Sequence, residues 1–171
     1  MPERPRRGPT SAVASLQSFS SDDPGAKLTC YELEPEVAGG FGHTTVIETS
    51  VTPNVVTRLE YEFDGWLGDE LVESISVHLV TTRVREALVD AEITGIRFAP
   101  VTVSRSDQFD EVHRGGLPEW AWMQVVGAPA RDDAWIGDGQ ILTVSGRMLA
   151  VLQRFPLSHC RVVPRDVSPS S

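Results

Sequence analysis

Two similar segments occur in the chain, and this repetition constrains the fold more than any other feature. Residues 76–103 and 140–163 each have the pattern of a strand, a hydroxyl side chain, a short helix and a second strand. Thr82 and Ser145 stand where a helix N-cap belongs, because a side-chain oxygen there accepts a hydrogen bond from an otherwise unpaired backbone N–H. The alternative to a duplication is the chance similarity of two generic units.

Apolar residues recur at helical spacing after both hydroxyl residues, which predicts short helices over 83–91 and 146–155. The residues on these apolar faces are Val84, Ala87, Leu88 and Ala91 in one copy, and Met148, Leu149, Leu152 and Phe155 in the other. Strands are expected to flank them at 77–80, 96–103, 141–144 and 159–164. The final strands contain Pro100 and Pro164, which are expected at a sheet edge or at a strand end because proline lacks an N–H.

Outside the repeat, β-branched or alternating patterns predict further strands over 28–34, 44–49, 55–63 and 120–126. The clearest alternation is in 55–63, where Glu60 and Glu62 share a face that is interpreted as solvated. These elements predict an α+β fold, a mostly antiparallel sheet with two short helices. The single domain is expected to span 28–165, with a flexible tail at 1–27 and a frayed end at 166–171.

The charge balance narrows the possible partners. Lys and Arg number 15 against 24 Asp and Glu, which gives a net charge of −9. A nucleic-acid binder needs a positive face for phosphate contacts, so we expect no nucleic-acid partner. An acidic surface is compatible with a basic protein partner, whose approach it would accelerate, although acidity also serves solubility alone.

Metal, redox and membrane signals are weak in the sequence. The two cysteines, Cys30 and Cys160, build neither a disulfide framework nor a zinc ribbon, and the four histidines lack the spacing of a metal site. We therefore expect no metal and no cofactor. The segment after Arg6-Arg7 lacks an apolar core, and no stretch approaches the about 18 apolar residues of a membrane span, so a cytoplasmic protein without a membrane partner is expected.

Patterns for covalent catalysis are also incomplete, and no catalytic residue is predicted. Ser145-Gly146 follows a strand but lacks the preceding glycine of a nucleophile elbow. His159 and Cys160 are neighbours on a strand and should face opposite ways. A rival hypothesis is an enzyme whose loops gather His113 with Asp110 or Asp132, and another is a scaffold subunit of a larger assembly.

The strongest binding potential lies between the two copies. Asp107, Asp110 and Glu111 lie in a polar loop, and Trp120 and Trp122 share one face of the following strand. Carboxylates steer a protein partner and aromatic side chains anchor it, so these five residues are the predicted partner-binding residues. The tryptophans qualify only if they are exposed, and burial in the core is the alternative. The oligomeric state is not predicted.

Four segments carry a family resemblance, namely Leu79-Val-Thr-Thr-Arg-Val-Arg-Glu-Ala-Leu88, Gly95-Ile-Arg-Phe-Ala-Pro-Val101, Ile141-Leu-Thr-Val-Ser-Gly-Arg-Met-Leu149 and Leu157-Ser-His-Cys-Arg-Val162. They resemble immunity proteins of bacterial polymorphic-toxin systems, relatives of the myxobacterial double-CxxCG family. The resemblance implies a protein that binds and neutralises a cognate toxin, and occlusion of the toxin is the expected mechanism. The chain lacks the cysteine pairs of the double-CxxCG members, so no zinc role and no binding residue is carried over.

Overall fold

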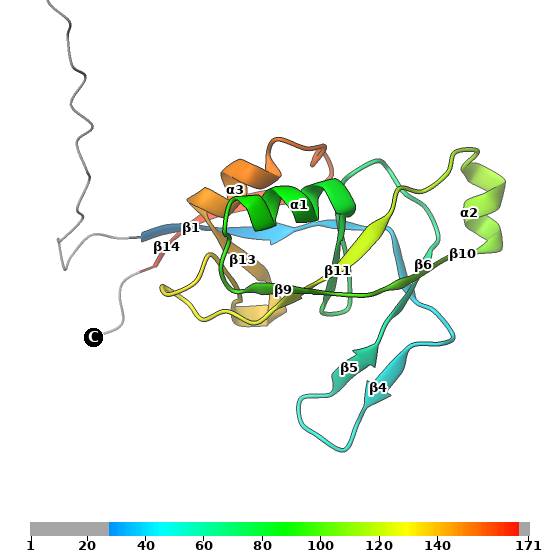
Figure 1. The fold of residues 1–171 in the computed structure, drawn as a ribbon, viewed down its shortest axis with the longest axis horizontal. Helices are drawn as coiled ribbons and strands as arrows, with labels where there is room; N and C mark the ends of the chain where they lie inside the picture. Colours follow the sequence, from blue (N-terminus) through cyan, green and yellow to red (C-terminus); the bar gives the residue numbers. More distant parts are fainter. Residues whose placement is uncertain (1–27, 168–171) are drawn as a thin grey trace, which may run out of the picture.

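The computed structural model describes residues 28–167 (Figure 1). The strands are β1 (Leu28–Glu34), β2 (Glu36–Val37), β3 (Gly39–Phe41), β4 (Val46–Glu48), β5 (Val55–Arg58), β6 (Glu60–Phe63), β7 (Leu71–Ser74), β8 (Val77–Thr81), β9 (Ile96–Ala99), β10 (Thr102–Arg105), β11 (Trp120–Val125), β12 (Ala134–Ile136), β13 (Leu142–Ser145) and β14 (Arg161–Val167). The helices are α1 (Thr82–Asp90), α2 (Asp107–Val112), α3 (Gly146–Leu152) and the short 3-10 helix η1 (Asp138–Gln140). The α+β class is confirmed.

Two sheets hold the repeated units. The larger has the strand order β2-β7-β8-β11-β9, and the other has the order β12-β13-β1-β14. In both units the strand before the helix and the strand after it are separated by one inserted strand, which is antiparallel to both. The flanking strands β8 and β9, and likewise β13 and β14, are therefore parallel to each other. Both units thus have the same split strand–helix–strand topology.

The correspondence extends beyond the repeat seen in the sequence. An antiparallel strand precedes each unit, β7 beside β8 and β12 beside β13. The inserted strands come from outside the units. Strand β1 precedes the first unit in the chain but is inserted in the sheet of the second unit, and β11, which lies between the units in the chain, is inserted in the sheet of the first. Because each unit borrows a strand from outside its own segment, neither can form its sheet alone.

The helices of the two units contact each other on the same side of the molecule (Figure 1). Helix α1 packs on β8 and β11, and α3 packs on β1 and β13. Their apolar faces share one core, in which Val84 and Leu88 of α1 meet Met148, Leu149 and Leu152 of α3. Both predicted helices are present, but α1 ends at Asp90 and α3 at Leu152, so Ala91 and Phe155 lie beyond them. Of the predicted face residues, Ala87, Ala91 and Phe155 are only partly buried, and the others are buried.

A second core lies on the other face of the large sheet. In β8, Val80 belongs to the core under the helices, whereas Val77 and Leu79 belong to the second core. There they meet Tyr61 and Phe63 of β6, the central strand of a three-stranded sheet with the order β10-β6-β3. The large sheet therefore separates a helical layer from a small second sheet.

Two predicted strands are each divided in the structure. The 55–63 strand breaks at Leu59: β5 pairs with β4 in a projecting two-stranded ribbon, and β6 joins the three-stranded sheet (Figure 1). The 96–103 strand breaks at Pro100-Val101 into β9 and β10, which belong to different sheets. Proline cannot donate a ladder hydrogen bond, which explains the second break.

The remaining predictions differ at the boundaries. The 44–49 strand shortens to β4, and α2 forms within a segment expected to be a loop. Residues 1–27 and 168–171 of the predicted tails lie outside the described residues, while 166–167 belong to β14. None of the helices in the described part of the chain has the length and hydropathy required to span a membrane.

Candidate functional site

Five aromatic rings form a closed circuit of contacts beneath the segment predicted to bind a partner. Centroids lie 4.7 Å apart for Phe109–His113 and 6.1 Å apart for His113–Trp66. The circuit continues through Trp66–Trp120 at 5.8 Å and Trp120–Phe63 at 5.2 Å, and it closes through Phe63–Phe109 at 6.4 Å. Aromatic pairs at such distances attract beyond the area they bury, so the circuit fixes α2 against the start of β11. We call it the aromatic circuit.

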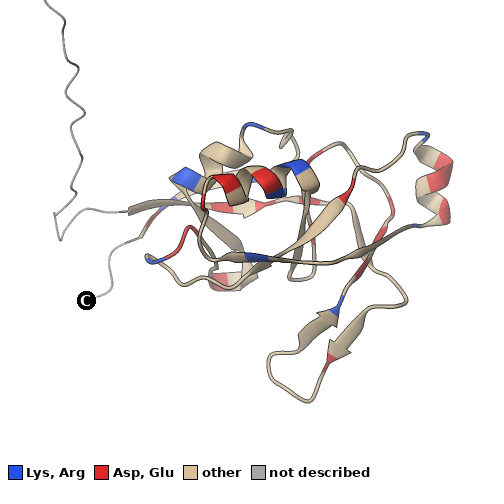
Figure 2. Cartoon of the chain, viewed as in Figure 1, with Lys and Arg blue, Asp and Glu red and all other residues tan. Residues whose placement is uncertain are grey.

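Helix α2 carries the three predicted carboxylates. The Ser106 hydroxyl caps it by accepting a hydrogen bond from the Phe109 N–H at 3.2 Å, and the Phe109 side chain is fully buried. Asp107, Asp110 and Glu111 are exposed, and Figure 2 shows acidic positions along α2. Asp110 lies 3.2 Å from Arg105, and both side chains are about half exposed. The helix therefore presents an acidic face to solvent while one aromatic residue attaches it to the core.

The two tryptophans of β11 have different environments. Trp122 is 7% exposed and belongs to the second core. The anchoring role predicted for it required an exposed side chain, so Trp122 does not qualify. Both residues lie on one strand face as predicted, but that face covers the core. Trp120 is half-buried, and its indole N–H, which is itself buried, has no hydrogen-bond partner among residues 28–167. Trp120 is thus the better placed of the two predicted anchors.

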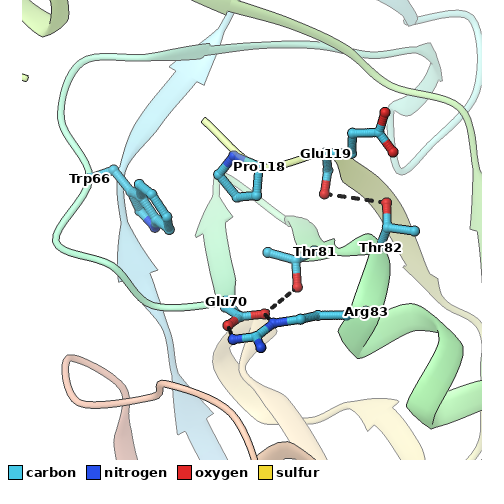
Figure 3. Close-up of a pocket in the computed structure, with 7 residues that line it drawn as sticks. All are labelled: Trp66, Glu70, Thr81, Thr82, Arg83, Pro118 and Glu119. Atoms are coloured by element: carbon cyan, nitrogen blue, oxygen red, sulfur yellow. Dashed lines mark hydrogen bonds and ion pairs between the residues drawn. The ribbon is translucent and has the colours of Figure 1, made fainter. Parts of the chain in front are cut away.

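A hollow of about 460 Å³ adjoins the aromatic circuit (Figure 3). Its lining residues are Trp66, Glu70, Thr81, Thr82, Arg83, Pro118 and Glu119. Trp66 stands on one side, and the first residues of α1 stand on the other. A second hollow of about 300 Å³ shares Thr82 and is lined by Trp120. Both hollows border the beginning of β11, so Trp66 and Trp120 each line a concave surface.

An ion pair between the buried Glu70 and the exposed Arg83 lines the first hollow. Glu70 accepts hydrogen bonds from the Arg83 guanidinium, through Nε at 2.7 Å and through Nη2, and from the Thr81 hydroxyl at 2.5 Å. Burial raises the pKa of Glu70, but the hydrogen bonds from Arg83 and Thr81 outweigh it and leave the pKa below its usual value. The pair joins β7 to the start of α1. The predicted N-cap of α1 was therefore wrong by one residue. Thr81 rather than Thr82 is the N-cap, and its hydroxyl donates to Glu70 instead of capping the helix.

Two large apolar side chains are exposed beside these features. Leu67 follows Trp66 and is 68% exposed, and Val112 ends α2 and is also 68% exposed. We define the candidate surface as the three carboxylates of α2 together with Val112, Trp66, Leu67 and Trp120. It combines exposed charge with apolar contact area, which is the composition of a protein-binding patch.

Glu60, predicted to lie on a solvated strand face, is instead 8% exposed. Its carboxylate accepts hydrogen bonds from the Thr44 hydroxyl at 2.6 Å and N–H at 2.7 Å, and from the Ser104 hydroxyl at 2.8 Å. These bonds, from Thr44 first and then Ser104, lower the pKa of Glu60 to about 2. The prediction failed because β6 is the central strand of its sheet, with loop residues covering the second face.

The enzyme hypothesis combined His113 with Asp110 or Asp132. Asp110 and His113 both belong to the end of α2, where His113 packs within the aromatic circuit. Asp132 lies elsewhere, in the loop before β12, and accepts a hydrogen bond from the Ala128 N–H at 2.8 Å. The neighbouring Asp133 binds Arg147, whose hydrogen bonds are the main reason that the pKa of Asp133 is strongly lowered. These carboxylates hold loops and helix ends in position.

A group that the sequence did not indicate lies where β2, β7 and β14 begin. One ligand atom from each of Glu36, Asp69 and His159 lies within 4.8 Å of the others. The residues are 33 and 90 positions apart, so no local spacing signals their proximity. Burial, followed by the charge of Asp69, raises the pKa of the adjacent Cys160 thiol to about 12. Cys160 is therefore a poor nucleophile.

Comparison with protein-family models and with curated proteins returned no match for this chain.

Proposed function

We propose that this protein is a non-catalytic binding module of the cytoplasm that neutralises a cognate toxin by occluding it. One observation carries the proposal: the aromatic circuit joins the acidic helix α2 to Trp66 and Trp120 in a single surface. The charges predicted for steering and one of the tryptophans predicted for anchoring therefore lie together, although Trp120 and Glu111 are 9 positions apart in the sequence.

The physical properties of the candidate surface support recognition of a basic protein. Exposed carboxylates accelerate the approach of a positively charged partner, whereas buried apolar contact mainly slows its dissociation. Leu67 and Val112 supply the apolar area and are already exposed, so covering them with a partner is favourable. The family resemblance supplies the class of partner, a toxin made beside its own immunity protein.

The proposal requires the reading frame directly upstream to encode a toxin, so the test is co-expression with the product of that reading frame, followed by purification and a growth assay. We expect a stoichiometric complex and protection of the cell. Replacing Asp107, Asp110 and Glu111 with lysine should slow association by about tenfold or more and weaken its dependence on salt. The matched control, lysine at the exposed residues Glu86, Asp138 and Asp166, makes the same change in charge elsewhere.

A second pair of variants tests the apolar part. Leu67→Ala with Val112→Ala should mainly speed dissociation, and both side chains are too exposed for their loss to unfold the protein. The control is Ile75→Ala with Val89→Ala, which removes side chains that are 79% and 56% exposed. Absence of a stoichiometric partner and of protection from the upstream product would refute the proposal.

A further inference from the structure

Three side chains of metal-ligating type converge beside the loop that carries Trp66 and Leu67, whose backbone and indole N–H groups donate to Glu36 and Asp69. Glu36 belongs to β2, Asp69 lies two residues before β7, and His159 lies two residues before β14. One donor atom from each lies within 4.8 Å of the other two. The loop that carries His159 belongs to the second copy of the repeat, whereas Asp69 lies in the loop before β7, ahead of the first copy.

Backbone hydrogen bonds hold both carboxylates in fixed orientations. Glu36 accepts from the Leu67 N–H at 2.6 Å and the Asp69 N–H at 3.3 Å, one on each oxygen. Asp69 accepts from the Ser158 N–H at 2.9 Å and the His159 N–H at 2.8 Å. Each carboxylate oxygen has more than one acceptor position, so these bonds leave capacity for a cation. The group is positioned in advance of any binding.

The charges within the group do not balance. Glu36 is 7% exposed and Asp69 is 1% exposed. Among residues 28–167, the one basic side chain in an ion pair with either carboxylate is His159, whose Nδ1 lies 3.1 Å from Asp69 Oδ1. An imidazolium contributes a single positive charge against two carboxylates. Buried anions are normally paired or bound to metal, so a divalent cation would complete the balance.

We propose that Glu36, Asp69 and His159 form a binding site for a divalent transition-metal cation, with zinc as the representative ion. An imidazole with two carboxylates suits Zn²⁺ or Mn²⁺ better than Ca²⁺ or Mg²⁺, which prefer ligand sets of oxygen alone. Zinc ligands in a tetrahedral site lie about 3.4 Å apart, given bonds of about 2.1 Å. Asp69 and His159, 3.1 Å apart, lie close to this spacing, and the ligand atom of Glu36 lies within 4.8 Å of both.

The exposure of His159 provides a route of entry. Its side chain is 42% exposed while that of Asp69 is 1% exposed, so the site opens to solvent on the imidazole side, where water completes the coordination. A bound ion would cross-link β2, the loop before β7 and the loop before β14. Its role is therefore to stabilise the joint between the second repeat copy and the segments that precede the first copy.

The experiment uses the full chain after dialysis against a chelator, titrated calorimetrically with Zn²⁺ alone and monitored for its unfolding temperature. We expect one Zn²⁺ per chain and a higher unfolding temperature in its presence, because ligands that bind only the folded state stabilise it. His159→Ala should weaken binding by at least about tenfold. Glu36→Gln should weaken binding too, while its remaining oxygen still accepts a backbone N–H.

The matched control is His43→Ala, which removes an exposed histidine from another loop and should leave the affinity unchanged. A cobalt titration adds a spectroscopic readout, since Co²⁺ bound through His159 gives a visible absorption band that His159→Ala abolishes. The proposal is overturned if the intact chain fails to bind Zn²⁺ stoichiometrically, or if His159→Ala binds it as tightly as the unaltered protein.

Discussion

Arg147, the second residue of α3, connects the two copies of the repeat through Asp133. Its Nη2 donates to Asp133 Oδ2 at 2.5 Å and its Nε to Oδ1 at 3.2 Å. The same guanidinium donates to the carbonyls of Ala91 at 3.0 Å and Glu92 at 2.8 Å, at the end of α1. One side chain thus binds the strand that precedes the second unit and the helix end of the first.

Arg147→Ala should destabilise the protein by about 1–2 kcal/mol, a value below that of a fully buried charged network because the arginine is half exposed. The loss should appear as a lower midpoint of urea unfolding with an unchanged slope. Arg114→Ala is the control, since that exposed side chain lies in the loop after α2. Equal midpoints for the two variants would contradict the linking role of Arg147.

The two predicted helix caps should respond differently to alanine. The Ser145 hydroxyl accepts from the Met148 N–H at 3.1 Å and donates to Asp133 at 2.7 Å, so Ser145→Ala should cost about 1–2 kcal/mol. Thr82→Ala should cost less than about 0.5 kcal/mol, because its hydroxyl makes a single long bond of 3.4 Å to Glu119. Thermal unfolding of both variants measures the difference, and a larger loss for Thr82→Ala would reject this assignment.

Local patterns in the sequence predict the repeated units well because they depend on short-range periodicity. The apolar residues of both helices occur at the spacing of a buried helix face, and Leu88 and Met148 are indeed fully buried. The insertion of β1 and β11 in these sheets could not be predicted, since the pairing of strands distant in sequence leaves no periodic trace. The break at Leu59 was missed for the related reason that alternation continues through it.

The candidate surface was predictable only in part. Composition indicates an acidic, aromatic segment, but exposure depends on which face of β11 covers the second core, and that face contains Trp122. Trp66 and Leu67 were missed because they precede a strand by several residues and have no motif. The Asp69–His159 pair joins residues 90 positions apart, a relationship that only the tertiary fold creates.

Leu88 and Val89 are sequence neighbours on opposite sides of α1 and provide a matched test of the helical core. Leu88 is fully buried against α3, whereas Val89 is 56% exposed. Leu88→Ala should cost about 2–5 kcal/mol, because it removes buried methyl groups and leaves a cavity. Val89→Ala should change the free energy of unfolding by less than about 0.5 kcal/mol. Urea denaturation of both variants tests the orientation of α1, and similar losses would contradict it.

Glu60 should make the stability of the protein depend on pH in the acid range. Its folded-state pKa is lowered from 4.5 to about 2, first by the Thr44 hydroxyl and then by the Ser104 hydroxyl. A carboxylate with a depressed folded pKa stabilises the protein above its unfolded pKa, and this contribution is lost as the pH falls through the folded value. Glu60→Gln should therefore be less stable than the unaltered protein at pH 7, and the difference should shrink between about pH 4.5 and 2.

Thr44→Val should reproduce part of this effect, because it removes one donor and leaves the carboxylate in place. Free energies of unfolding from urea titrations at intervals across this range provide the measurement, and parallel pH profiles for Glu60→Gln and the unaltered protein would show that the hydrogen bonds to Glu60 do not favour its ionised form.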